Sequence, residues 1–263
     1  MMLKNKVAVI YGAGGAVGGA VARAFGRDGA TLFLTGRRRA RLDHVAREIA
    51  SSGGTVETAE VDALDEQSVN KHLQSVIDKV GRVDISFNAV GIPNTTLQGV
   101  PLVDLDLDHF SLAISPYTRA YFLTARLAAR RMLAQKAGVI MTVTPLPARA
   151  GVPLLGGFAP AMSAVEGLTR GLSAELAPHG IPVVGLRTDG TPDSGTIQEV
   201  FGIHAKAYGM TWQQFHDVVA GKNHRRRLAS LAEMANVAAV MASDSASALT
   251  GTTVNLSMGA LDD

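Results

Sequence analysis

The sequence contains no cysteine and no long run of apolar residues. The first absence excludes disulfide bonds and thiolate chemistry. The second excludes a membrane-spanning helix, which needs about 20 consecutive apolar residues. Charge of one sign is not concentrated either, because 25 Lys and Arg stand against 23 Asp and Glu and the basic residues are scattered. We therefore expect neither a nucleic-acid partner nor attachment to a membrane surface.

Other chemical signals are also missing. The seven histidines are dispersed, without the spacing of metal ligands, so we expect no metal site. No G-x-S-x-G motif of a serine hydrolase occurs. A glycine-rich stretch begins at Gly12, which leaves no room for the apolar core of a signal peptide. We therefore expect a cytoplasmic protein.

What the chain does have is a regular alternation of short apolar runs and longer amphipathic segments. This pattern is typical of a parallel sheet covered by helices on both faces. It predicts a single α/β domain over residues 1–263, a Rossmann-type doubly wound sheet of about seven strands. The expected strands are Val7–Tyr11, Thr31–Thr35, Val56–Val61, Val83–Asn88, Val139–Thr144, Val183–Leu186 and Thr252–Leu256, and helical patterns include Val17–Arg27, Arg38–Ser51, Glu66–Val80, Phe110–Gln135 and Phe158–Ala177.

One stretch, residues 190–227, departs from this alternation. It follows a late strand, is mixed in pattern, and contains the single tryptophan, Trp212. Ligands of doubly wound sheets bind at the carboxyl ends of the strands, and an insertion here lies near that edge. We expect a lid-like helical insertion that covers a substrate; the alternative is a helical pair that only packs on the rim.

The first strand leads directly into a glycine-rich turn and a helix. The beginning of a helix offers unpaired N–H groups and the positive end of the helix dipole, which together bind a pyrophosphate. This placement favours a dinucleotide site. The predicted contact residues are Gly12, Gly14, Gly15 and Gly18.

The end of the second strand indicates which dinucleotide binds. An acidic residue at this point would bind the ribose hydroxyls of NAD, but the chain has Gly36 followed by Arg37. A guanidinium can form paired hydrogen bonds with a 2′-phosphate. We therefore expect NADP(H) as cofactor, the alternative being that these arginines are the solvated beginning of a helix.

Several segments together resemble the short-chain dehydrogenase/reductase family over nearly the whole chain. YGAGGAVG is similar to the T-G-x-x-x-G-x-G turn of that family, FNAVG to N-N-A-G, and VDALDEQSV to the segment whose aspartate lies by the adenine. The segments VEGLTRGLSAELAPHGIPVVGL and MASDSASALTGTTVNLSMGA match later parts of the family pattern. The resemblance implies that Asp62, Asn88 and Gly91 also contact the cofactor. The family's P-G pair after the sixth strand is replaced here by Thr188-Asp189.

The residues that catalyse the family's hydride transfer are replaced. In the family a tyrosine donates the proton, a lysine four residues later lowers the pKa of that tyrosine, a serine polarises the carbonyl, and an asparagine anchors a proton path. Alignment with the family places Phe158 at the tyrosine, Met162 at the lysine, Thr144 at the serine and Tyr117 at the asparagine. Phe158 has no exchangeable proton and Met162 no charge. Only Thr144 keeps a hydroxyl.

No other tyrosine restores the relay, because none of the four precedes a lysine by four or seven residues. Tyr117 is the candidate for a relocated acid, the alternative being a structural aromatic side chain. We therefore assign Thr144 and Tyr117 as candidate catalytic residues. Phe158 and Met162 are expected to line an apolar pocket.

Three functions remain open at this point. The first is an NADPH-linked reductase with an unusual proton source. The second is a non-redox enzyme, an isomerase, lyase or cyclase, in the same pocket, and the third is a catalytically inactive nucleotide-binding protein. The expected ligand is a small molecule, for which the pocket offers an apolar surface. The resemblance implies a homotetramer or a homodimer.

Overall fold

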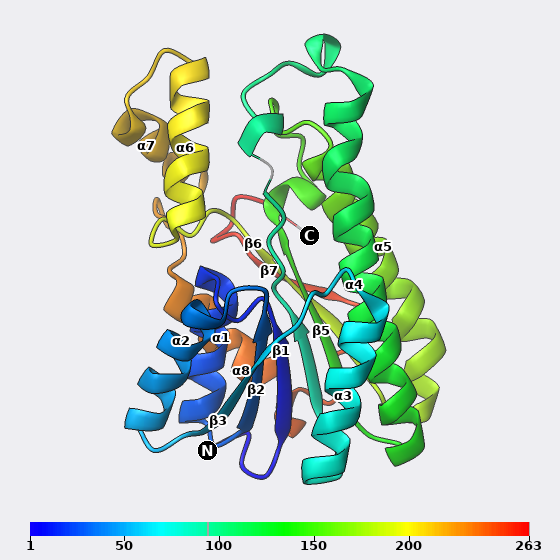
Figure 1. Ribbon diagram of the computed structural model, residues 1–263. Coiled ribbons are helices and arrows are strands. Elements are labelled where there is room, and N and C mark those ends of the chain that lie inside the picture. Colours follow the sequence, from blue (N-terminus) through cyan, green and yellow to red (C-terminus); the bar gives the residue numbers. More distant parts are fainter. Residues whose placement is uncertain (94, 263) are drawn as a thin grey trace.

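The computed structural model describes residues 1–93 and 95–262 of the chain. Its centre is a parallel sheet of seven strands in the order β3-β2-β1-β4-β5-β6-β7 (Figure 1). The strands are β1 Val7–Tyr11, β2 Thr31–Gly36, β3 Thr55–Glu60, β4 Ile85–Asn88, β5 Val139–Pro145, β6 Val183–Thr188 and β7 Thr253–Leu256. This architecture confirms the predicted doubly wound fold.

The α-helices of the described chain connect these strands. They are α1 Ala16–Arg27, α2 Arg39–Ser51, α3 Glu66–Val80, α4 Leu107–Gln135, α5 Phe158–Leu176, α6 Gly195–Ala207, α7 Trp212–Lys222 and α8 Leu231–Met241. Helix α4 begins three residues before the predicted Phe110, because the carboxylate of Asp106 accepts a hydrogen bond from the backbone N–H of His109 and caps the helix there.

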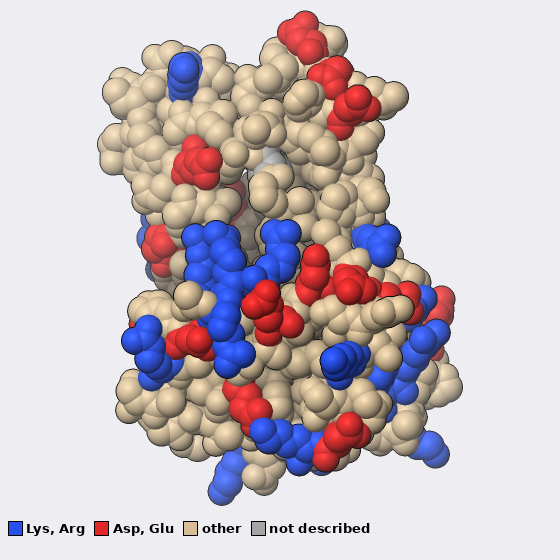
Figure 2. All heavy atoms as spheres, viewed as in Figure 1, with Lys and Arg blue, Asp and Glu red and all other residues tan. Residues whose placement is uncertain are grey.

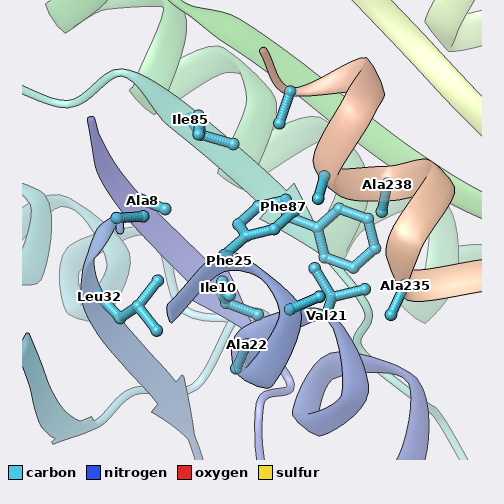
Figure 3. Close-up of a cluster of buried hydrophobic side chains, with 14 of the residues drawn as sticks. Ala8, Ile10, Val21, Ala22, Phe25, Leu32, Ile85, Phe87, Ala235 and Ala238 are labelled. Carbon is cyan, nitrogen blue, oxygen red and sulfur yellow. The ribbon is translucent and has the colours of Figure 1, made fainter. Parts of the chain in front are cut away.

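The helices cover both faces of the sheet, as the sequence predicts. One apolar cluster joins one face of the sheet to α1, α2 and α8, and a second joins the other face to α3, α4 and α5. Figure 3 shows part of the first cluster, where Phe25 of α1 lies against Phe87 of β4 with the ring centroids 6.4 Å apart. Alanines of α8, such as Ala235 and Ala238, let that helix approach closely (Figure 3).

The strand order reverses between β1 and β4, which are neighbours in the sheet although two strands separate them in the chain. At such a switch point the loops leave the sheet in opposite directions, so that a crevice opens at the carboxyl ends of the strands. Above this edge, α6 and α7 form one lobe and the beginning of α4 forms another (Figure 1). Figure 2 shows the surface hollowed between the two lobes.

Candidate functional site

The turn between β1 and α1 has the close packing that glycine permits. Gly12 has a φ of +74°, and a Cβ atom on it would lie 2.5 Å from the carbonyl oxygen of Ala89. A Cβ atom on Gly18 would lie 2.5 Å from the carbonyl oxygen of Gly12. These contacts bring the turn, the beginning of α1 and the loop after β4 together. A side chain at Gly12 or Gly18 would therefore collide with the neighbouring backbone.

No side chain accepts a capping hydrogen bond from the N–H donors at the N-terminus of α1. Gly15 is the N-cap residue, no side chain caps the helix, and its first turn contains no acidic residue. The adjoining groove between α1 and α2 is lined by Gly14, Gly15, Ala16, Arg23, Ala40, Arg41, His44 and Val45. Uncapped N–H groups beside such a groove suit the phosphates of a dinucleotide. The residues present thus fit this cofactor.

Arg37 follows β2 directly and is exposed to solvent. Within the described chain its guanidinium forms no ion pair or hydrogen bond, whereas Arg39 pairs with Asp43 at 3.0 Å and Arg23 with Glu48 at 2.5 Å. Figure 2 shows basic side chains gathered immediately below the hollow. Arg37 is therefore available to an anion bound beside the glycine turn.

The other predicted cofactor contacts lie around the same crevice, but some of their polar atoms are used within the chain. Asp62 accepts a hydrogen bond from the N–H of Leu64 at 3.0 Å. Asn88 is buried: its amide donates to the hydroxyl of Thr124 at 2.8 Å and its Oδ1 accepts from the N–H of Val90. Asn88 therefore fixes the loop after β4 to α4.

Gly91 lies in the loop that Asn88 fixes, and a Cβ atom on it would have no neighbour within 4 Å. Space next to the backbone is thus open at this residue. The structure brings the glycine turn, Arg37 and the loop carrying Gly91 to the carboxyl edge of neighbouring strands.

Phe158 and Met162, which are predicted to stand at the tyrosine and lysine positions of the family, belong to one apolar cluster at the beginning of α5. Met162 is 2% exposed and packs with Leu97, Tyr121 and other apolar side chains. Phe158 is half-buried, and its ring centroid lies 5.5 Å from that of Tyr117. This cluster is therefore apolar and aromatic.

Tyr117 reaches the cluster from α4, and its phenol is engaged by the chain. The hydroxyl donates to the carbonyl oxygen of Ile92 and accepts from the N–H of the same residue, both at 3.2 Å. Burial raises the pKa of Tyr117 above its usual value. These contacts are those of a structural aromatic residue that holds the loop after β4.

Thr144 lies at the end of β5, where its hydroxyl donates to Oε1 of Glu166 at 2.9 Å. Glu166, on α5, is also paired with Arg187 of β6 at 2.8 Å, and all three residues are buried. The hydroxyl proton of Thr144 is thus directed into the protein interior. Sequence reasoning missed this network, although a glutamate in the apolar run AVEGL and an arginine inside a buried strand were visible signals.

Asp189 is the first residue after β6, and it is 8% exposed. Burial raises the pKa of its carboxyl to about 6, although a hydrogen bond from Asn223 and the charge of Lys222 oppose this shift. The nearby Asp193 has a different role, because it accepts hydrogen bonds from the N–H of Leu231 at the beginning of α8. Arg149 is exposed in the loop after β5.

The segment predicted to be a lid-like insertion contains the helices α6 and α7. Phe201 of α6 packs against Phe215 and Trp212 of α7, with ring centroids 5.3 Å and 6.1 Å apart. The tryptophan therefore belongs to the small core of the pair. A hydrogen bond of 3.2 Å joins buried His204 of α6 to Gln98, in the segment before α4. The pair is thereby connected to the opposite lobe.

No group of three or more His, Cys, Asp or Glu side chains among the described residues is arranged to hold a metal ion. No helix in this part of the chain combines the length and apolar character that a membrane span requires.

Comparison with known proteins identifies the family. Residues 12–260 match the family model described as enoyl-(acyl carrier protein) reductase. The uncharacterized oxidoreductase YxbG of Bacillus subtilis (strain 168) is 28% identical over 249 residues, which cover 95% of this chain and 88% of the relative. The chain therefore belongs to the short-chain dehydrogenase/reductase family of oxidoreductases.

Solved structures support the fold. A xylitol dehydrogenase bound to NAD+ aligns with a TM-score of 0.92 at 22% identity, covering 98% of this chain and 100% of its own. A gluconate 5-dehydrogenase from Burkholderia cenocepacia J2315, in complex with NADP and tartrate, aligns with a TM-score of 0.85 at 23% identity, covering 98% and 96%. At these identities the likeness concerns the fold alone, and these two neighbours hold different coenzymes.

Proposed function

We propose that this protein is an NADP(H)-binding oxidoreductase of its family that works without the tyrosine–lysine proton relay. The observation that carries the coenzyme assignment is Arg37. Its exposed guanidinium has no partner within the described chain and stands directly after β2, beside the glycine turn. When bound, the cofactor supplies the hydride; Gly12, Gly14, Gly15 and Gly18 would hold its pyrophosphate and Arg37 its 2′-phosphate, with Asp62, Asn88 and Gly91 around it.

The proposal of an absent relay depends on Phe158 and Met162. Both belong to the apolar cluster that also contains Tyr117. A phenyl ring and a thioether can neither donate a proton nor steady an anion, so the proton for a reduced substrate must come from elsewhere. This apolar cluster favours a substrate with an apolar part.

A second candidate function, a nucleotide-binding protein without turnover, is favoured by the engaged hydroxyls. The phenol of Tyr117 is held by Ile92 and the hydroxyl of Thr144 by Glu166. On this view both candidate catalytic residues are structural, and the nucleotide site alone is functional.

Assembly is a further part of the proposal. Helix α4 presents exposed apolar side chains, among them Leu112, Phe122 and Leu133. Burial of such residues stabilises contacts between subunits. We propose that α4 contributes to a homodimer or homotetramer, with α5 beside it.

The coenzyme assignment is tested by measuring the dissociation constants of NADPH and NADH from protein fluorescence. We expect the wild type to prefer NADPH. In Arg37→Gln the affinity for NADPH should fall by roughly 10- to 100-fold, because charge-assisted hydrogen bonds to the phosphate are lost, while the affinity for NADH should stay unchanged.

Arg39→Gln is the matched control, since it removes the same charge from the beginning of α2 but from a residue paired with Asp43. Equal binding of NADPH and NADH by the wild type would contradict the assignment. So would equal losses in the two variants, which would point to a general effect of charge.

A further inference from the structure

Asp189 lies at the carboxyl end of β6, and β6 lies beyond the switch point between β1 and β4. In doubly wound sheets one half of the dinucleotide lies over the strands before the switch point and the other over the strands after it. The glycine turn follows β1, so β4, β5 and β6 underlie the second half. Thr188, immediately before Asp189, pairs with Pro145 at the carboxyl end of β5.

The surroundings of Asp189 are polar on the side of α7, where Asn223 is its neighbour. Asn223, which ends α7, is 1% exposed and donates through Nδ2 to the carbonyl oxygen of Arg227 at 2.9 Å. Its Oδ1 is buried and has no hydrogen-bond partner within the described chain. Asn223 also donates a hydrogen bond to the carboxyl of Asp189, so its unpartnered Oδ1, on the same amide group, lies near that carboxyl. Both oxygens are acceptors that favour a cation or an N–H donor.

The charged groups on the surrounding elements do not neutralise this carboxyl. The charge of Lys222, at the end of α7, lowers the pKa of Asp189, but Lys222 is exposed to solvent. His224, which follows Asn223, is exposed as well. Arg187 of β6 is engaged by Glu166, and Asp193 of the same loop caps α8. The next residue, Gly190, is packed against the apolar side chains of Phe201 and Leu228.

We propose that Asp189 faces the nicotinamide ring and discriminates between the two redox forms of the coenzyme through its negative charge. The oxidised ring is a cation and the reduced ring is neutral. A carboxylate next to the ring therefore stabilises bound NADP+ and has little effect on bound NADPH. This inference depends on the proposed NADP(H) site. It adds to that site Asp189 as the group whose interaction with the coenzyme depends on the charge of the nicotinamide ring.

A pH dependence follows. The pKa of Asp189 is about 6 in the free protein, so the carboxyl is mostly neutral at about pH 5 and mostly ionised above about pH 7. The affinity for NADP+ should rise across this range relative to the affinity for NADPH. The 2′-phosphate also titrates near pH 6, but both coenzymes carry it, so its effect cancels in the ratio of their dissociation constants.

The experiment measures the dissociation constants of NADP+ and NADPH with the full chain from about pH 5 to about pH 8. For the wild type we expect the ratio of the constant for NADP+ to that for NADPH to fall roughly threefold to tenfold as the pH rises. In Asp189→Asn, which keeps the size of the side chain, the ratio should be flat. In Asp193→Asn, the matched control in the same loop, the ratio should behave as in the wild type.

Proton release provides a second readout that needs no variant. Binding of NADP+ at about pH 6 should release protons, detected by calorimetry in buffers of different ionisation enthalpy, and release should exceed that on binding NADPH. A flat ratio in the wild type, or a pH dependence that survives in Asp189→Asn, would overturn the inference while the NADP(H) site stands. Failure of both coenzymes to bind would overturn the proposed function, and the inference with it.

Discussion

The ring of Phe158 lies 5.5 Å from the ring of Tyr117, with an angle of 60° between the two planes. The contact joins the beginning of α5 to α4. A tilted aromatic pair of this kind stabilises packing beyond the area that it buries. Phe158 therefore has a packing role. In the proposed function, this is the residue at which a proton donor is missing.

The first prediction restores the missing groups. In the double variant Phe158→Tyr/Met162→Lys, reduction of simple ketones by NADPH should rise above the level of the wild type, because a phenol and an ammonium group return to the pocket. Met162 is 2% exposed, so a lysine there should also lower the free energy of unfolding by roughly 2–4 kcal/mol.

Turnover is followed by NADPH absorbance and stability by urea denaturation. Met162→Leu is the matched control and should cost less than about 1.5 kcal/mol, because volume is conserved. Rapid reduction of simple ketones by the wild type would show that the relay is present in another form.

The second prediction concerns the network of Thr144, Glu166 and Arg187. Glu166→Gln should lower the free energy of unfolding by roughly 3–5 kcal/mol, because it breaks the buried ion pair between Glu166 and Arg187. Thr144→Val should cost only about 1 kcal/mol, since the carboxylate keeps its ion pair with Arg187 at 2.8 Å.

Denaturant unfolding of the two single variants and the double variant measures these costs. The effects should not be additive, because the two side chains share a hydrogen bond of 2.9 Å. Equal losses from the two single variants would argue that the charge of Glu166 is not what stabilises the network.

The third prediction uses His72, which α3 buries against Phe33 of β2. Burial lowers the pKa of His72 from 6.5 to about 4, so the folded protein holds the neutral ring while the unfolded chain takes up a proton below pH 6.5. The stability that this residue contributes is complete above pH 6.5 and is lost as the pH falls toward 4. The loss should amount to roughly 2–3 kcal/mol.

Denaturant unfolding between about pH 7 and pH 4 measures this loss for the wild type and for His72→Leu. The variant should lose less stability than the wild type over this range, because the leucine does not titrate. Identical slopes would mean that His72 is protonated in the folded state as well.

The sequence determined the fold and the nucleotide turn because both depend on local order. Alternating apolar runs and amphipathic segments specify parallel strands and covering helices, and the observed strands lie within a few residues of the predicted ones. The turn at Gly12 and Gly18 was readable because its residues are adjacent in the chain. Arg37 was readable for the same reason, since it follows the second strand directly.

Only the tertiary structure decided which polar groups are free to act. Thr144 and Tyr117 are candidate catalytic residues by sequence, but their hydroxyls are held by Glu166 and by the backbone of Ile92. Asp189 lies in an ordinary loop by sequence, yet the fold buries it and brings Asn223, 34 positions further along the chain, within hydrogen-bond distance of its carboxyl. Such contacts join residues far apart in the chain, and the availability of a proton or a charge depends on burial and partners that no local pattern records.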